Sequence, residues 1–154
     1  MLEPRFIKAF GCENVEVITR EIKLDTKGNN DIRDITSAVE KAVGASGLKD
    51  GTVTVFVVGS TAAITTMEYE PGLKEDIPAA LERIAPYRAD YEHHKTWGDY
   101  NGSAHVRSAL IGPSLVIPII GGRLATGTWQ QIALLDFDTR PRERRIVLQI
   151  IGGR

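Results

Sequence analysis

Segments with strand character follow one another along this chain, some with only a glycine or a proline between them, and this succession limits the folds open to it. The segment GTVTVFVVG, residues 51–59, is followed directly by a second strand-like segment at 62–69. Neighbouring parallel strands need a crossover of about a dozen residues or more, whereas antiparallel neighbours need only a short turn. A doubly wound parallel sheet is therefore disfavoured. The other strand-like segments are 5–10, 13–24, 114–119, 122–138 and 142–152.

One helix is predicted over residues 31–47, where apolar side chains recur at helical spacing. Asn30 or Asp31 can cap its start, because a short polar side chain can accept a hydrogen bond from the first free backbone N–H groups. Gly44 or Gly47 can end it, because glycine adopts the left-handed conformation that closes many helices.

A second helix is predicted over residues 71–86, with Pro78 as an interruption inside its apolar stripe. The segment 13–24 alternates instead with the period of a strand and predicts that one face carries Ile18, Ile22 and Leu24. At 154 residues the chain has the length of about one domain. We therefore expect a single α+β domain over residues 1–154, with a large mixed or antiparallel sheet and helices packed on one face.

Charge and cysteine content argue against several classes of protein. Nineteen basic and twenty acidic residues give a net charge of −1, so there is no bulk electrostatic case for binding nucleic acid. No apolar run approaches the about 18 residues that a membrane span requires, and the first residues lack the apolar core of a signal peptide. Cys12 is the only cysteine and cannot form an internal disulfide, which fits a reducing compartment. We expect a cytoplasmic protein with no membrane and no nucleic-acid partner.

All three histidines lie within thirteen positions, in the stretch YEHHKTWGDYNGSAH. Imidazole binds zinc and similar ions, and protonated imidazole pairs with phosphate. Asp99 and Asn101, in the same glycine-containing loop, can coordinate a metal or orient an imidazole. The alternative is a polar turn, because Asp and Asn before Gly are typical turn residues. Ser103 is a candidate helix N-cap, which would place His105 and Arg107 in the first turns of a helix whose free N–H groups can seat a phosphate.

Three further patches carry candidate functional residues. Ser60 and Thr61 supply hydroxyls at the end of the strand 51–59, and Glu68 with Glu70 can form an acid–base pair or a solvated strand end.

The second patch, GTWQ, offers Trp129 for stacking and Gln130 for hydrogen bonding to a ring, or else a core or interface position. Arg123 can bind an anion or be solvated. The third patch, TRPRERR, carries arginines at 140, 142, 144 and 145. They can hold phosphate or RNA, but the interleaved acidic residues favour an exposed patch or ion pairs between subunits.

The ordered set STAAITTME, DYEHHKTWGDYNGSAHVRSALIGPSLVIPI, GRLATGTWQQIALLDFD and RPRERRIVLQIIGG resembles the YjbQ family, also called the secondary thiamine-phosphate synthase enzyme family. The resemblance covers nearly the whole chain and is closest over residues 51–154. It implies an α+β fold, small single-domain subunits, a homotrimer and a His-rich metal or anion site near a subunit boundary. The activity it implies is the formation of thiamine phosphate from a pyrimidine diphosphate and a thiazole phosphate, with release of pyrophosphate.

The resemblance also assigns roles to residues of this chain. Glu68 and His105 are expected to be catalytic, and a divalent metal such as Zn or Mg would be held by His93, His105 and Asp99. Substrate or anion contacts are expected from Ser60, Thr61, Asn101, Ser103, Arg123, Trp129 and Gln130. Gly59 and Ser103 stand where many relatives carry histidine, and His94 is a candidate replacement ligand. These two departures favour the alternative, a non-catalytic trimer that binds a metal or a phosphorylated metabolite.

Overall fold

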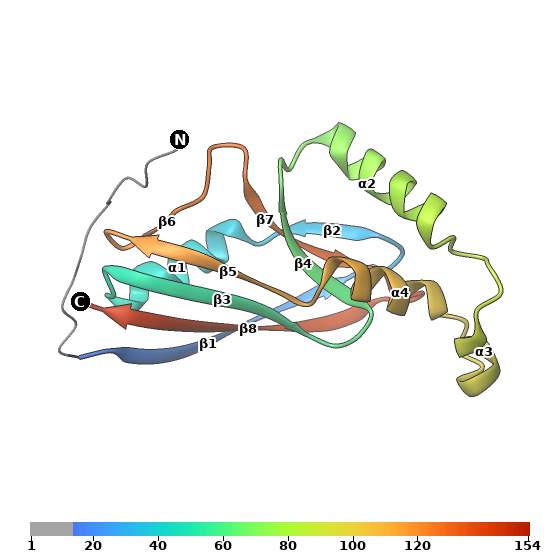
Figure 1. Ribbon diagram of the computed structural model, residues 1–154, viewed down its shortest axis with the longest axis horizontal. Helices are drawn as coiled ribbons and strands as arrows, with labels where there is room; N and C mark the ends of the chain where they lie inside the picture. Colours follow the sequence, from blue (N-terminus) through green and yellow to red (C-terminus); the bar gives the residue numbers. More distant parts are fainter. Residues whose placement is uncertain (1–13) are drawn as a thin grey trace, which may run out of the picture.

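The computed structural model describes residues 14–154, so the predicted strand at 5–10 and Cys12 lie outside the described residues. Helices and strands alternate irregularly along the described chain (Figure 1). In chain order they are β1 (Glu16–Thr26), β2 (Asp31–Asp34), α1 (Thr36–Ser46), β3 (Asp50–Val58), β4 (Ala62–Met67), α2 (Pro71–Ile84), α3 (Glu92–Trp97), α4 (Gly102–Ile111), β5 (Ser114–Ile120), β6 (Arg123–Leu124), β7 (Gln131–Asp136) and β8 (Arg142–Gly153). Within residues 14–154, no helix combines the length and the apolar character that crossing a bilayer requires.

The strands form two antiparallel sheets, which confirms the predicted α+β class. The larger sheet has the order β1-β8-β3-β5-β6, and the smaller has the order β2-β7-β4. In the larger sheet β8 is an interior strand, because it pairs with β1 on one side and β3 on the other, both antiparallel. The long succession of strands without crossover helices therefore has the consequence expected from the sequence.

The first core lies between the inner face of the larger sheet, α1 and one face of the smaller sheet. Strand alternation supplies it, since every second side chain of β3, β5 and β8 points inward. In β1 the predicted apolar face, which carries Ile18, Ile22 and Leu24, packs against this core. The fully buried members include Val39, Val55, Ile132, Leu134, Ile146, Leu148 and Ile150.

A second core covers the opposite face of the smaller sheet, where α2 and α4 pack (Figure 1). Ala63, Ala133 and Leu135 face these helices, and their strand neighbours face the first core. The smaller sheet is thus buried on both faces, while the larger sheet keeps its outer face exposed. The larger sheet has α1 on one face, whereas the smaller sheet has α1 on one face and α2 with α4 on the other.

The first predicted helix begins later than expected, because of local pairing and capping. Residues 31–34 pair with β7 as β2, so α1 begins at Thr36, not at residue 31. The carboxylate of Asp34 accepts a hydrogen bond from the Thr36 N–H at 2.8 Å, which takes the capping role predicted for Asn30 or Asp31. The predicted end is confirmed, because Gly47 has a left-handed φ of 72°.

The predicted helix at 71–86 is confirmed as α2, with Pro78 inside it. It begins directly after Glu70, whose carboxylate accepts hydrogen bonds from the N–H groups of Gly72 (2.6 Å) and Leu73. Glu70 therefore serves as a helix cap and is not the second carboxylate of an acid–base pair with Glu68. The predicted strand at 122–138 is divided into β6 and β7 by an intervening loop.

Candidate functional site

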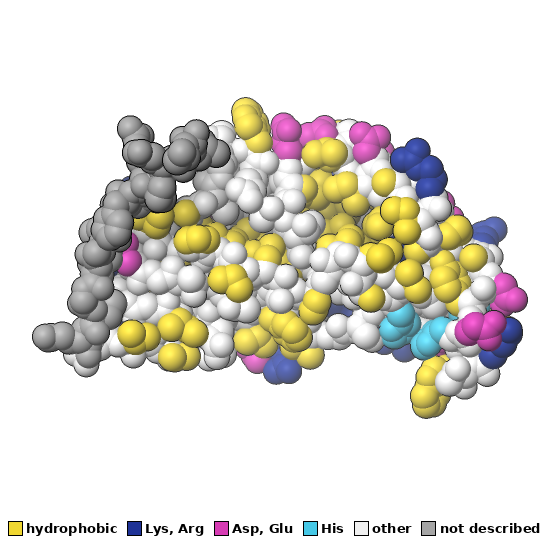
Figure 2. Space-filling model, in the orientation of Figure 1, with side chains coloured by type: hydrophobic (Ala, Val, Ile, Leu, Met, Phe, Trp, Pro, Cys, Tyr) yellow, Lys and Arg dark blue, Asp and Glu magenta, His cyan; other side chains and the backbone are white. Residues whose placement is uncertain are grey.

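The three histidines lie on two short helices at one end of the molecule. His93 and His94 belong to α3, and His105 belongs to α4. Gly98, with a left-handed φ of 69°, ends α3 and turns the chain back toward α4. Figure 1 shows this pair of helices at the opposite end from β6, and Figure 2 shows the histidines there beside acidic and basic side chains. The stretch that looked like a polar loop is therefore partly helical.

His93 and His105 form an imidazole pair, with ring centroids 4.4 Å apart and ring planes at 47°. The Nε2 atom of His93 lies 3.2 Å from a carboxylate oxygen of Asp99. The amide nitrogen of Asn101 donates to the same carboxylate oxygen at 3.0 Å and to His93 Nε2 at 3.1 Å, because an amide oxygen in that position would face only acceptors. Asp99 and Asn101 therefore fix the orientation of one imidazole of the pair.

His105 is the less constrained member of the pair. Among residues 14–154 its ring has no hydrogen-bond partner that meets normal geometry. Partial burial lowers the pKa of His105 below its usual value, and the neighbouring His93 lowers it further. At neutral pH His105 is therefore an uncharged imidazole, with one N–H to donate and one lone pair to offer.

His94 stabilises the start of α4. Its Nε2 atom accepts a hydrogen bond of 3.2 Å from the backbone N–H of Gly102, the first residue of α4. Its ring lies 5.4 Å from that of Tyr91 and 5.0 Å from that of Tyr100. The approach requires glycine, since a Cβ on Gly102 would lie 2.6 Å from Tyr91 Cβ. One of the two ring nitrogens of His94 is therefore already used to hold the start of α4.

The start of α4 does not have the arrangement predicted for a phosphate-binding helix N-terminus. Asn101 occupies the N-cap position, not Ser103, which lies inside the helix and is buried. The Ser103 hydroxyl has no hydrogen-bond partner among the described residues. Arg107 points away from the helix N-terminus into the interior, where it donates to the Ala85 carbonyl at 2.9 and 2.8 Å. It is therefore an anchor for α4 and is not available to a phosphate.

The length of β4 separates Glu68, the other predicted catalytic residue, from the imidazole pair. Thr61, just before β4, is buried and donates a hydrogen bond of 3.0 Å to Asp138. Glu68 follows the far end of the same strand, about 20 Å away at 3.3 Å per residue. Ser60 and Glu68 are both exposed. Within one chain the structure brings His93, Asp99, Asn101 and His105 together, but not Glu68.

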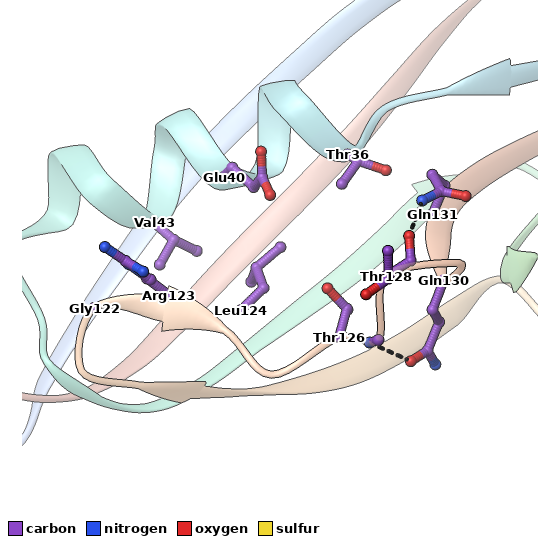
Figure 3. A pocket seen from close by; sticks show the side chains of 11 residues that line it. Thr36, Glu40, Val43, Gly122, Arg123, Leu124, Thr126, Thr128, Gln130 and Gln131 are labelled. Carbon is purple, nitrogen blue, oxygen red and sulfur yellow. Dashed lines mark hydrogen bonds between the residues drawn. The ribbon is translucent and has the colours of Figure 1, made fainter. Parts of the chain in front are cut away.

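A third group of predicted residues lies around a different cavity, of about 520 Å³, between α1 and residues 122–131 (Figure 3). Arg123 and Gln130 line it, together with Glu40 of α1. The Gln130 carboxamide is held by the Gly127 N–H at 3.1 Å. Trp129 is 71% exposed and does not line this cavity. The substrate residues inferred from the GTWQ motif are therefore remote from the histidines of the same chain.

The sequence favoured an exposed patch or ion pairs between subunits for the arginines of TRPRERR, but the structure places residues 138–142 beside Asp99 and Asn101. Asp138, Thr139, Arg140 and Arg142 line a cavity of about 350 Å³ together with Asp99 and Asn101. The balanced charges of this segment made it resemble a solvated surface. A signal was nevertheless present in the clustering of arginines at 140, 142, 144 and 145, a residue type that binds phosphate.

The predicted metal ligands lie near one another but do not form a metal-binding group in this structure. In the described part of the chain, no three His, Cys, Asp or Glu side chains form a group that could hold a metal ion. His93 Nε2 is in contact with Asp99 and Asn101, whereas neither ring nitrogen of His105 has a hydrogen-bond partner among the described residues. These residue types can bind a divalent metal, but they are not grouped around one point, so metal binding stays a prediction from the resemblance.

Comparison with known proteins gives consistent matches. The family model described as UPF0047 protein YjbQ-like matches residues 20–153. A UPF0047 protein of Archaeoglobus fulgidus is 40% identical over 131 residues, which cover 85% of this chain and 99% of the relative. A crystal structure of a YbjQ-like protein of unknown function from Sulfolobus solfataricus P2 has a TM-score of 0.85 at 35% identity and covers 90% of this chain and 99% of that one. A family protein from Clostridium acetobutylicum has a TM-score of 0.77 at 36% identity, with 85% and 98% covered.

Proposed function

This chain belongs to the UPF0047 YjbQ-like family, and we propose that it joins a pyrimidine diphosphate to a thiazole phosphate at the imidazole pair, as a secondary thiamine-phosphate synthase does. The thiazole nitrogen attacks the methylene carbon of the pyrimidine. A carbon–nitrogen bond forms, the bond from carbon to the diphosphate oxygen breaks, and pyrophosphate leaves with the electron pair. No proton leaves the nucleophile, so the protein's task is to orient both substrates and stabilise the leaving group.

His105 lies beside the oriented His93, with ring centroids 4.4 Å apart, and this geometry is the single observation that carries the proposal. The N–H of His105 can donate to an oxygen of the departing pyrophosphate, where negative charge develops. His93, oriented by Asp99 and Asn101, can support the same oxygen or the pyrimidine. A charge-stabilising role does not require Glu68, which lies at the far end of β4.

The experiment is a turnover assay of His105→Ala with a pyrimidine diphosphate and a thiazole phosphate. We expect the rate of thiamine phosphate formation to fall by a factor of about 100 or more, as after the loss of one oriented donor. His105→Asn keeps an N–H donor and should recover part of the rate. Val106→Ala changes the next, exposed position of α4 and should leave the rate unchanged. Turnover by His105→Ala at the parental rate would contradict the proposal.

The second candidate is a binding protein without catalysis. The distance of Glu68 from His105 favours it, because the carboxylate predicted to be catalytic does not lie beside the imidazole pair. Wild-type protein that forms no thiamine phosphate, yet melts at a higher temperature with pyrophosphate or a divalent metal, would support this reading. The expected cytoplasmic location fits both candidates.

We also propose that the chain assembles as a homotrimer through the outer face of the larger sheet. This face exposes apolar side chains on three of its strands: Val17 of β1, Phe56 and Val58 of β3, and Val116 and Ile120 of β5. Exposed apolar patches of this kind typically mark protein interfaces. An assembly would also allow the Trp129 region of one chain to approach the histidines of another.

Sedimentation equilibrium at low micromolar concentration should therefore give about three times the chain mass of 16.9 kDa. Val116→Lys places a charge in the patch and should shift the mass toward that of the monomer. Ile84→Lys, at an exposed apolar position on α2 outside the patch, should leave the mass unchanged. A monomeric wild-type protein would refute the assembly.

A further inference from the structure

The cavity beside the imidazole pair has a wall of two arginines that the proposed chemistry has not used. Arg140 and Arg142 line this cavity of about 350 Å³ and are the two basic residues of its lining. They share the cavity with Asp99 and Asn101. Its volume falls in the range of about 300–1,000 Å³ that is usual for small-molecule sites. Through Asp99 and Asn101 the cavity borders directly on His93.

The backbone that carries these arginines is held in place at both ends. The Asn29 N–H donates to the Asp138 carbonyl at 2.7 Å, and the Thr26 hydroxyl donates to the Arg142 carbonyl at 3.0 Å. Gly28, with a φ of +72°, allows the close approach, since a Cβ there would lie 2.5 Å from the Asp138 carbonyl oxygen. A wall fixed in this way loses little conformational entropy when it binds a ligand.

The charges of the wall leave cationic groups available. Asp138 is buried and receives hydrogen bonds from Arg142 Nε at 2.8 Å, the Thr61 hydroxyl and the Thr139 N–H. Because only Nε of Arg142 is engaged, its two outer nitrogens remain free to donate. Arg140 has no carboxylate within ion-pair distance among residues 14–154.

We propose that Arg140 and Arg142 bind the diphosphate or phosphate group of the ligand, as an anion subsite next to the imidazoles. Guanidinium groups match phosphate oxygens with paired N–H donors and keep their charge at any physiological pH. Asp138 orients Arg142 and neutralises its inner side, while Arg140 supplies the uncompensated charge. The inference deepens the proposed function and rests on it for the identity of the anion as leaving pyrophosphate.

The test is calorimetric titration of the full chain with inorganic pyrophosphate, and separately with inorganic phosphate, in metal-free buffer. We expect saturable binding of pyrophosphate, weakened about tenfold in Arg140→Ala, which removes one charge-assisted contact. Arg142→Lys, which keeps the charge but loses the paired donors, should also weaken it. Arg145→Ala is the matched control, because this arginine pairs with Glu21 at 2.9 Å and lies outside the cavity; its affinity should equal that of the wild type.

Asp99→Asn gives a test of opposite sign. Removing the carboxylate from the cavity wall should tighten pyrophosphate binding by about twofold or more, because a like charge is lost. A site for a divalent cation would respond in the other direction. No binding by the wild type, or equal affinity in Arg140→Ala and Arg145→Ala, would overturn the inference.

The same variants separate this inference from the proposed function. Loss of turnover in His105→Ala together with unchanged pyrophosphate affinity in Arg140→Ala would overturn the anion subsite and leave the proposed reaction standing. Arg140-dependent pyrophosphate binding by a protein that forms no thiamine phosphate would support the subsite and contradict the reaction.

Discussion

Arg144→Met should lower the free energy of unfolding by about 3–5 kcal/mol, because it leaves a buried carboxylate without its counter-ion. Asp136 is fully buried, and Arg144 donates to both of its oxygens at 2.6 Å. Arg144 also donates to the Thr61 hydroxyl at 2.8 Å, so it joins β8 to β7 and to the start of β4. Chemical denaturation monitored by circular dichroism measures the change.

Two comparisons identify the cause of this loss. Arg145→Met removes the neighbouring but exposed arginine and should change the free energy of unfolding by less than about 1 kcal/mol. The double variant Arg144→Met/Asp136→Leu removes both charges and should recover part of the lost stability, because it also removes the acceptor of the Asp138 N–H (2.9 Å) and of the Thr26 hydroxyl. A single Arg144→Met variant as stable as the wild type would show that the pair contributes nothing to folding.

Arg107→Met should destabilise the protein by about 2–4 kcal/mol, since it leaves buried acceptors without donors. Arg107 is 1% exposed and donates to the Ala85 carbonyl, to Asn30 at 2.8 Å and to Glu82. These contacts fix α4 to the end of α2 and to the turn before β2. The denaturant midpoint reports the loss, and the His93–His105 arrangement should loosen with it.

Glu82→Gln supplies the control for Arg107. The Glu82 side chain is half exposed, so water can replace its ion pair and the cost should stay below about 1 kcal/mol. Arg107→Lys keeps the charge but cannot reproduce the two bonds to the Ala85 carbonyl, and should fall between the two variants. Equal effects of Arg107→Met and Glu82→Gln would mean that the hydrogen bonds to the Ala85 carbonyl do not contribute to the free energy of unfolding.

The parts of the fold that follow from local pattern were predictable. Alternation over residues 13–24 gave the correct inward face of β1, and the apolar stripe of 71–86 gave α2. The four residues of β2 were not, because a strand this short has no period of its own and exists only by pairing with β7. Residues 31–34 therefore looked like the first turn of a helix.

The candidate site was predictable only where its residues are close in sequence. His93, Asp99, Asn101 and His105 lie within thirteen positions, and the structure joins them. The separation of Glu68 from His105 depends on the direction of β4, which residue types do not specify. Arg140 and Asp99 are about forty residues apart in the sequence, and their contact with one cavity depends on how the intervening strands pair. No local pattern of residues specifies that pairing.

The position of β8 between β1 and β3 in the larger sheet has a consequence for how the chain folds. Its partners β1 and β3 lie far earlier in the sequence, with Gly152 opposite Glu16 at one end of the ladder. The sheet therefore closes only after most of the chain has been brought together, and long loops must lose their entropy before these contacts form. Until then β1 and β3 lack the strand that stands between them, and their backbone groups remain open to pairing with other chains. Slow closure and concentration-dependent misassembly follow directly from that topology.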